Sequence, residues 1–383
     1  MATKKLLGQY FTTDESLLNR VKILIMNKEG TILEPSFGQG NLLEISFCDN
    51  TRPIIGYEID KNIKILKSLR EKVSRCHAVI KLRYTDFLSA NIKERFTTIV
   101  ANPPYCKIKG SQNLYLEFIK KCYSLLESDG EMIFIVPSDF LKATNSAGLI
   151  EEMSLSGSFT HFYFPDCENL FDGASIDVVV FRYQLGLKQN TTIVNDVVKY
   201  IDTTDGIISF SNSENRGVPI ENLFDVYVGI VSGKDDVFQS DHGNVKVLTD
   251  FDTEKKFVLV SRFPTKSEKI NDLLLENKDA LLARRIRKFT ETNWFEWGAL
   301  RNINAIKDNV KKPCIYVRTI TRKDLVATKG QVQLFSGSLL CLIPKETLNL
   351  DDIVDQINAN RNDYTYSGRF KITHRQLSKM RIY

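Results

Sequence analysis

The stretch Thr31-Ile32-Leu33-Glu34-Pro35-Ser36-Phe37-Gly38-Gln39-Gly40-Asn41 decides the fold, because it combines a short strand, a glycine-containing loop and the start of a helix. Glycine at two alternate positions directly after a strand lets the backbone pass close to a ligand before the helix begins. A single Gly-x-Gly is a weak signal by itself. The segments around it must show whether a ligand binds there.

Three later strands are predicted, and each of them also ends on polar or aromatic side chains. They are Pro53–Tyr57 before Glu58-Ile59-Asp60 and a basic helix at 61–72, Val79–Arg83 before Asp86-Phe87, and Thr98–Ala101 before Asn102-Pro103-Pro104-Tyr105. An acid about 20 residues past the glycines is placed to bind a ribose hydroxyl pair. Because open α/β sheets bind ligands at the carboxyl ends of their strands, this order predicts an α/β domain with one composite site.

The fourth strand exit has a chemistry of its own. Two prolines after Asn102 predict a rigid, extended loop. The Asn102 side-chain carbonyl and the Pro103 backbone carbonyl are two acceptors without a base, which suits an exocyclic amino group. Tyr105 adds a face on which a flat ring can stack. Asn-Pro-Pro alone is also compatible with an ordinary strand exit, so the rest of the chain must decide.

The remaining pattern predicts two domains. Helical spacing covers Asp14–Lys28, with Thr13 or Asp14 as N-cap, and Asn113–Leu126. Further strands are expected at Met132–Val136, Phe159–Phe164, Ile176–Phe181, Val194–Ile201 and Ile207–Phe210. The polar, aperiodic segment 212–217 predicts a linker between a first domain at 1–211 and a second at 218–383. The second domain has short strands, turns, and aromatic residues interleaved with arginines.

Composition indicates an ordinary globular protein, with 383 residues, 43% hydrophobic and 26% charged. The chain shows neither a signal peptide nor about 18 consecutive apolar residues, so we expect a cytoplasmic protein that binds no membrane. Seven scattered cysteines without a Cys-x-x-Cys pair read as reduced thiols, and with four unclustered histidines we expect no metal site.

Charge is distributed unevenly along the chain. Residues 1–250 carry a net −5 and residues 251–383 a net +10, and 281–330 alone carry +8. A charge run is often only a solvated surface. The sign and place of this one favour a polyanion bound mainly by the second domain.

Taken in order, Glu34-Pro35-x-Phe37-Gly38-x-Gly40, Tyr57-Glu58-Ile59-Asp60, Asp86-Phe87 and Asn102-Pro103-Pro104-Tyr105 resemble the motifs of the adenine-N6 DNA methyltransferases with the TaqI-like, gamma-type arrangement. The resemblance is tight up to about Phe181 and loose after Gly217. It implies a Rossmann-like class I methyltransferase domain, with a mostly parallel seven-stranded sheet containing one antiparallel strand. A mixed α+β target-recognition domain is expected to follow.

The resemblance also implies roles for individual residues. The cofactor would be S-adenosylmethionine, the base would be flipped out of duplex DNA, and Asn102, Pro103, Pro104 and Tyr105 would form the catalytic motif. Phe171 would stack on the base opposite Tyr105, although a core position at the sheet edge is the alternative. The expected cofactor contacts are Thr12 from the segment Gly8-Gln9-Tyr10-Phe11-Thr12, Glu34, Pro35, Phe37, Gly38, Gly40, Glu58 at the ribose, Ile59 and Phe87 on the two adenine faces, Asp86 at the adenine amino group, and Asn102.

In the second domain, the glycine-containing segment 227–238 and two basic stretches, 284–288 and 317–323, resemble parts of such recognition domains. Phosphate anchoring is the default expectation for their arginines. The expected DNA contacts are Gly229, Ser232, Lys234, Arg284, Arg285, Arg287, Arg318 and Arg322.

By this resemblance the chain is the modification enzyme of a restriction-modification system, acting on double-stranded DNA as a monomer, with a possible cognate restriction endonuclease that acts separately. Three alternatives stay open. One is an adenine methyltransferase for structured RNA. Another is a methyltransferase for a protein glutamine amide, although release-factor enzymes of that kind place a helical domain first, whereas here a basic domain follows. The third is a DNA-specificity subunit with a dead cofactor site.

Overall fold

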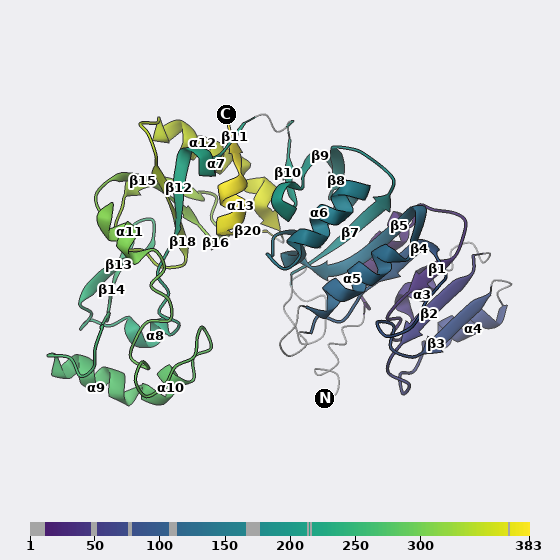
Figure 1. Ribbon diagram of the computed structural model, residues 1–383, viewed down its shortest axis with the longest axis horizontal. Helices are drawn as coiled ribbons and strands as arrows, with labels where there is room; N and C mark the ends of the chain where they lie inside the picture. Colours follow the sequence, from purple (N-terminus) through teal and green to yellow (C-terminus); the bar gives the residue numbers. More distant parts are fainter. Residues whose placement is uncertain are drawn as a thin grey trace. The chain divides into compact units, whose positions relative to one another are not determined.

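The computed structural model describes residues 12–46, 52–75, 79–106, 113–165, 177–212, 214, 217–366 and 368–383. The chain divides into two compact units, Met1–Asn215 and Arg216–Tyr383. The division lies inside the segment 212–217 that was expected to link two domains. Figure 1 shows the helices and strands of both units.

A ten-stranded sheet forms the centre of the first unit, in the order β10-β9-β8-β6-β7-β5-β4-β1-β2-β3. Its strands are β1 (Ile32–Glu34), β2 (Ile54–Glu58), β3 (Ile80–Tyr84), β4 (Phe96–Ala101), β5 (Leu126–Pro137), β6 (Gly157–Tyr163), β7 (Val178–Leu185), β8 (Thr191–Val194), β9 (Val197–Asp202) and β10 (Ser209–Ser211). Strands β1 to β5 pair in parallel, and β7 runs antiparallel to both β5 and β6. The order β3-β2-β1-β4-β5-β7-β6 confirms the class I methyltransferase sheet.

The expectation of seven strands with one antiparallel is wrong in number. The strand-like residues after β7 pair onto the edge of the sheet: β8 runs parallel to β6, and β9 and β10 add antiparallel strands. Their sequence predicted extended backbone, but strand propensity does not specify the partner, which the exposed edge of β6 supplies.

Helices cover both faces of this sheet (Figure 1). They are α2 (Glu15–Leu24), α3 (Asn41–Ser46), α4 (Lys67–Arg75), α5 (Leu114–Ser124), α6 (Ala147–Ser156) and the short 3₁₀ segments η1 (Ser138–Leu141) and η2 (Thr204–Gly206). Apolar residues of α2 and α3 pack with Val100, Ile133 and Val180 on one face. Residues that alternate with these in the strands face α6, where Tyr183 donates a hydrogen bond to the Met153 carbonyl at 2.8 Å.

Helix boundaries differ from the expected ones at three helices, one of which is α5, which ends at Ser124 and not at Leu126. Asp14 caps α2 as predicted, because its carboxylate accepts from the Leu17 N–H, but the helix ends at Leu24. The basic helix expected at 61–72 begins only at Lys67. The residues before it form a turn, in which Asp60 accepts from the Asn62 N–H and Gln39 accepts from the Leu66 N–H.

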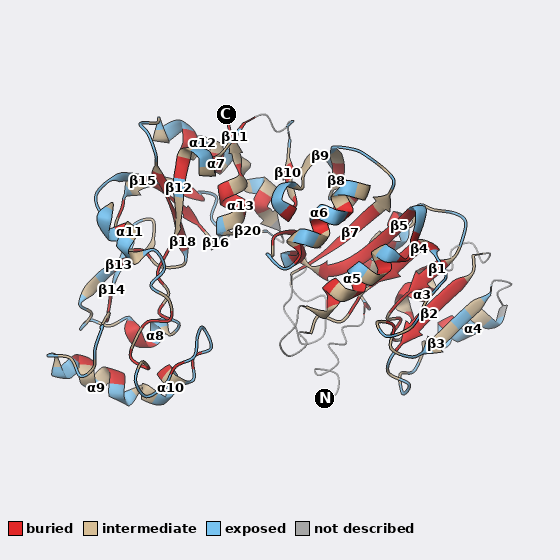
Figure 2. Cartoon of the chain, in the orientation of Figure 1, coloured by how far each residue is buried: buried red, intermediate tan, exposed pale blue. Residues whose placement is uncertain are grey.

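The second unit is a mixed α+β assembly around a four-stranded antiparallel sheet, β12-β18-β15-β17. Buried residues of that sheet pack with Ile353 and Ile357 of α12, while a second core gathers Trp294, Trp297 and Phe257. Figure 2 shows central strands of the two sheets, such as β2 and β7 in the first unit and β18 in the second, among the buried parts. The strands are β11 (Val218–Pro219), β12 (Phe224–Val228), β13 (Val245–Asp250), β14 (Thr253–Phe257), β15 (Pro313–Arg318), β16 (Ile320–Thr321), β17 (Ala327–Gln331), β18 (Leu339–Pro344), β19 (Thr365–Tyr366), β20 (Arg369–Lys371) and β21 (Arg381–Ile382), and the helices are α7 (Ile220–Leu223), α8 (Asp235–Phe238), α9 (Glu268–Glu276), α10 (Lys278–Leu282), α11 (Ile303–Asp308), α12 (Leu350–Ala359), η3 (Asn360–Tyr364) and α13 (His374–Lys379).

Within the described ranges, no helix combines the length and the apolar character needed to cross a bilayer.

Candidate active site

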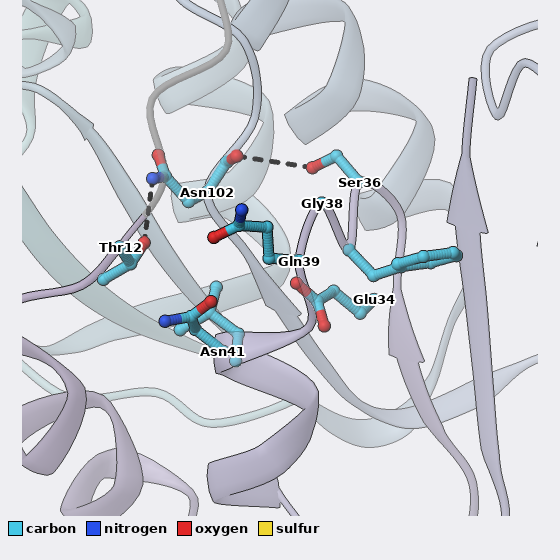
Figure 3. A pocket seen from close by; sticks show the side chains of 9 residues that line it. Thr12, Glu34, Ser36, Gly38, Gln39, Asn41 and Asn102 are labelled. Atoms are coloured by element: carbon cyan, nitrogen blue, oxygen red, sulfur yellow. Dashed lines mark hydrogen bonds between the residues drawn. The ribbon is translucent and has the colours of Figure 1, made fainter. Parts of the chain in front are cut away.

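A pocket opens at the carboxyl ends of β1 and β4 (Figure 3). It brings together five residues predicted from the sequence: Thr12, Glu34, Phe37, Gly38 and Asn102. Four other residues also line it, namely Ser36, Gln39, Asn41 and Leu42. The sequence held no signal for these four beyond their place in the glycine loop. Parallel strands therefore deliver side chains that are far apart in the chain to one site.

The glycine loop depends on backbone conformations that favour glycine. Gly38 has φ +53° and Gly40 has φ +93°, both in the left-handed region. A Cβ on Gly40 would lie 2.2 Å from Leu69 Cδ2, so a larger residue there would also clash with α4. Pro35 is buried behind the loop, and Phe37 N–H donates to the Tyr57 carbonyl at 2.9 Å. The loop is thus held against β2.

Glu34 is a buried carboxyl group, 2% exposed, that lines the pocket. Its Oε2 has no hydrogen-bond partner among the residues the structure describes. Burial and the nearby Glu58 charge raise the pKa of Glu34 well above its usual range. A carboxyl group in this state is suited to a ligand that brings its own positive charge.

Glu58, which the sequence assigned to a ribose, holds the glycine loop in place. Its Oε2 accepts from the Gly38 N–H at 2.9 Å, and its Oε1 accepts from the Asp60 N–H at 2.9 Å. A carboxylate has about four lone-pair sites, so hydroxyl contacts remain available to it. Ile59, directly after it, is 57% exposed and offers an apolar surface.

The Asp86-Phe87 turn differs from the expectation at Phe87. Asp86 Oδ1 accepts from the Leu88 N–H at 3.0 Å. The Phe87 ring is only 2% exposed, because it packs against Tyr57 and Phe118 with centroids 5.5 and 5.4 Å away. The ring is a core residue in this arrangement, and it does not offer an open face to an adenine.

Lys121 is a residue that sequence reasoning missed. Its ammonium group donates to the backbone carbonyls of Phe87 at 2.6 Å, Leu88 at 3.0 Å and Ala90 at 2.6 Å. It also lies 4.9 Å from the Phe87 ring centroid. Burial lowers the pKa of Lys121, although Asp86 opposes this shift. One cation on α5 therefore fixes the turn that carries Asp86.

Asn102 stands at the mouth of the pocket with both ends of its amide engaged. Its Nδ2 donates to Thr12 Oγ1 at 2.9 Å, and its Oδ1 accepts from the Tyr105 hydroxyl at 2.6 Å. Figure 3 shows the first contact, and also the Ser36 hydroxyl donating to the Asn102 backbone carbonyl at 3.3 Å. Pro103 is buried, while Pro104 and Tyr105 are half-buried. The loop is as constrained as its two prolines predicted.

Two expected contributions lie outside the described residues. One is Phe171, and the other is the segment Gly8 to Phe11. Of that N-terminal motif, Thr12 is described, and it is 5% exposed in the pocket wall.

Part of the chain matches known proteins. Residues 43–164, from α3 through β6 and including Asn102 to Tyr105, match the family model described as Eco57I restriction-modification methylase. Over these residues the chain is similar to the restriction-modification methylases. Type II methyltransferase M.HincII from Haemophilus influenzae is 27% identical over 265 residues, which cover 64% of this chain and 48% of that protein. This chain spans about half the length of the curated relatives it matches first.

Two further matches bear on substrate and fold. Ribosomal RNA small subunit methyltransferase A from Mycoplasmopsis synoviae (strain 53) is 30% identical over 105 residues, 27% of this chain and 39% of that protein. The Type IIL restriction-modification enzyme MmeI, solved in complex with DNA, has a TM-score of 0.58 at 10% identity, covering 99% of this chain and 65% of that one. The last similarity supports the fold alone.

In the second unit, the structure corrects the expectation for Arg284. Arg284 is 8% exposed, and its guanidinium donates to the carbonyls of Leu281, Ser232, Trp294 and Glu296 at 2.6 to 2.9 Å. Burial, with the nearby Arg287 charge, lowers its pKa to about 10. Four of its five N–H groups are used inside the protein. Arg284 therefore organises the basic loop rather than reaching a phosphate.

Arg318 is a second arginine that the structure assigns to the protein interior. It is 8% exposed, its Nε donates to Asp250 at 2.6 Å, and its guanidinium lies 3.8 Å from the Phe251 ring centroid. Although partial burial works against ionisation, the hydrogen bonds from Arg318 and Lys323 hold the pKa of Asp250 far below its usual range. The cluster stabilises a strand end and leaves this guanidinium little surface to offer a ligand.

The other expected DNA contacts are placed differently. Ser232 is 1% exposed and accepts from the Lys234 N–H at 3.1 Å, and a Cβ on Gly229 would lie 2.1 Å from the Ser336 carbonyl oxygen. The Lys234 ammonium pairs with Asp236 at 2.7 Å. Three arginines among the expected contacts are exposed, namely Arg285, Arg287 and Arg322. Of these, Arg287 pairs with Glu296 at 2.7 Å.

The contact from Arg284 to Ser232 joins two segments that the sequence left far apart. Ser232 also accepts from the Gly298 N–H at 2.9 Å, and Ile286 lies against Gly233 and Gly298. The glycine segment and the basic loop 284–288 therefore form one surface region of the second unit.

Proposed function

We propose that this chain transfers the methyl group of S-adenosylmethionine to N6 of an adenine flipped out of duplex DNA, as the modification methyltransferase of a restriction-modification system. The observation that carries the proposal is the Asn102 amide, held at the mouth of a pocket that contains the buried Glu34 carboxyl group. The match of residues 43–164 to the restriction-modification methylase model supports the same reaction class.

The pocket residues fit S-adenosylmethionine. Glu34, with an unpartnered buried oxygen, supplies a counter-charge for the amino-acid ammonium group. Gly38 and Gly40 let the backbone approach closely, and Glu58 retains lone pairs for ribose hydroxyls. The exposed Ile59 and the turn around Asp86 would hold the adenine ring of the cofactor. When bound, the cofactor supplies an electrophilic methyl group on a sulfonium.

Asn102 and Pro103 then act on the target base. The two carbonyl oxygens would accept the N–H bonds of an adenine amino group, which would localise its lone pair and stabilise the positive charge that develops on nitrogen. Tyr105 stacks on the base, which repays part of the few kcal/mol that flipping costs. Phe171 remains the proposed second stacking residue.

DNA phosphates are bound by the exposed cations of the second unit, with Arg285, Arg287, Lys234 and Arg322 as the proposed contacts. A net charge of +10 over residues 251–383 supports a polyanionic partner. We propose a monomer, with a cognate restriction endonuclease acting separately.

Asn102→Ala tests this proposal. It removes one acceptor without touching the second unit, so methyl transfer to DNA is expected to stop while DNA affinity stays within about twofold of wild type. Single-turnover transfer of labelled methyl groups measures the first quantity, and fluorescence anisotropy measures the second. Turnover that survives in Asn102→Ala would show that the catalytic assignment is wrong.

One alternative has an observation in its favour, the 30% identity with ribosomal RNA small subunit methyltransferase A over 105 residues. The same labelled-methyl assay with structured ribosomal RNA in place of DNA distinguishes the two. Labelling of RNA and not of duplex DNA would show that the substrate is RNA and not DNA. The glutamine-amide alternative would place the label on protein.

A further inference from the structure

The Asn102 amide is anchored by two hydroxyl groups from different parts of the chain. Thr12, from the segment before α2, accepts from Nδ2 at 2.9 Å, and Tyr105, from the loop after β4, donates to Oδ1 at 2.6 Å. Tyr105 is itself 3.2 Å from the Ile135 carbonyl of β5. The plane of the amide is therefore fixed at both ends, and each anchor is attached to a different element.

An asparagine side chain turns about two torsions, and its terminal torsion is soft. A single backbone position does not define where Oδ1 points. The Asn102 backbone carbonyl accepts separately from the Ser36 hydroxyl, at 3.3 Å, so this contact does not set the orientation of the side-chain amide. An acceptor must be held within about 0.5 Å of its productive place to act in methyl transfer.

We propose that Thr12 is a positioning residue for Asn102, in addition to its place in the wall of the cofactor pocket. Its hydroxyl keeps the amide plane in line with the incoming amino group, and because Thr12 also lines the pocket, it joins the cofactor site to the acceptor. This inference rests on the proposed function, since an anchored acceptor has a catalytic meaning only where an amino group is methylated.

Burial makes Thr12 suitable for this role and for a clean test. The residue is 5% exposed, so water does not freely replace its hydroxyl at Nδ2. Valine has nearly the same shape without the hydroxyl, and serine retains the hydroxyl without the methyl group. The pair Thr12→Val and Thr12→Ser therefore separates the hydrogen bond from the packing.

Two measurements on the full chain distinguish positioning from cofactor contact. Isothermal titration calorimetry with S-adenosylmethionine, in the absence of DNA, gives the cofactor affinity. Single-turnover methyl transfer to DNA at saturating cofactor gives the rate after binding. We expect Thr12→Val to leave the cofactor Kd within about threefold and to lower the rate about tenfold or more, as misplacement of a reacting group does. Thr12→Ser should restore the rate to within about threefold of wild type.

The outcomes separate cleanly. A Thr12→Val variant that loses cofactor affinity but reaches the wild-type rate at saturation would make Thr12 a cofactor contact only, and would overturn the inference. Equal losses in Thr12→Val and Thr12→Ser would assign the effect to packing, with the same consequence. A wild-type chain that binds the cofactor yet methylates no DNA would instead overturn the proposed function.

Discussion

Replacing Glu34 by glutamine is expected to stabilise the first unit at neutral pH and to weaken its hold on the cofactor. Glu34 is 2% exposed, and burial together with the Glu58 charge raises its pKa well above the usual range. The native state therefore binds the Glu34 proton more tightly than the unfolded chain does. Glutamine resembles the protonated carboxyl group in shape and carries no charge to bury.

The size of the effect follows from proton linkage. Below the unfolded pKa of about 4.3, both states hold the proton and the substitution should change stability little. As pH rises from there towards the raised native pKa, wild type loses stability relative to Glu34→Gln by up to about 1.4 kcal/mol per pH unit. The gap stops growing once the pH passes the native pKa.

The assay must report on the first unit alone, because both tryptophans, Trp294 and Trp297, lie in the second. Hydrogen exchange of peptides from β4 and β5, measured in increasing urea between pH 5 and 8, gives that local stability. The same substitution at exposed Glu29 is the matched control. Identical pH profiles for wild type and Glu34→Gln would refute the reasoning, as would a variant that is less stable than wild type at pH 7. Calorimetry should meanwhile show cofactor affinity reduced about tenfold, since a hydrogen bond to a charged group contributes about 1.5 to 3 kcal/mol.

Three other predictions concern residues whose contacts or exposure the structure establishes. Lys121→Met removes three hydrogen bonds to the carbonyls of the Asp86 turn and should raise the cofactor Kd about tenfold, as measured by calorimetry. The control is Lys120→Met, on the same helix but exposed, which should leave the Kd unchanged. Equal effects of the two substitutions would contradict the role of Lys121. Arg284→Met leaves four carbonyls without their donor and should lower the tryptophan-detected stability of the second unit by about 2 to 4 kcal/mol. Arg285→Ala should keep that stability, weaken DNA binding and reduce its salt slope by about 1; an unchanged salt slope would remove Arg285 from the phosphate contacts.

The sequence was sufficient to predict the convergence of Glu34, Gly38 and Asn102, whereas the place of Thr12 was implied by the family resemblance of its segment. Strand order in a parallel sheet places all carboxyl ends at one edge, so motif order along the chain becomes proximity in space. An α/β domain followed from the same regularity, and the class I sheet was implied by the family resemblance. Its extension by β8 to β10 did not, since strand-like residues do not encode which edge they join.

Burial of charged and aromatic groups was the part that the sequence could not predict. Arg284 and Arg285 are adjacent in a basic run, yet one satisfies interior carbonyls and the other faces solvent. Phe87 was expected as a cofactor contact and is a core ring, because Tyr57 and Phe118 enclose it. The contacts of Lys121 could not be predicted from the helical pattern, since its three acceptors are backbone carbonyls, which every residue has.

The most direct test of the central claim is to identify the methylated base. Duplex DNA is incubated with the chain and S-adenosylmethionine, digested to nucleosides and analysed by mass spectrometry, with Asn102→Ala as the control. We expect N6-methyladenine with the wild-type chain and none with the variant. DNA without a methylated base, or with N4-methylcytosine in place of N6-methyladenine, would contradict it.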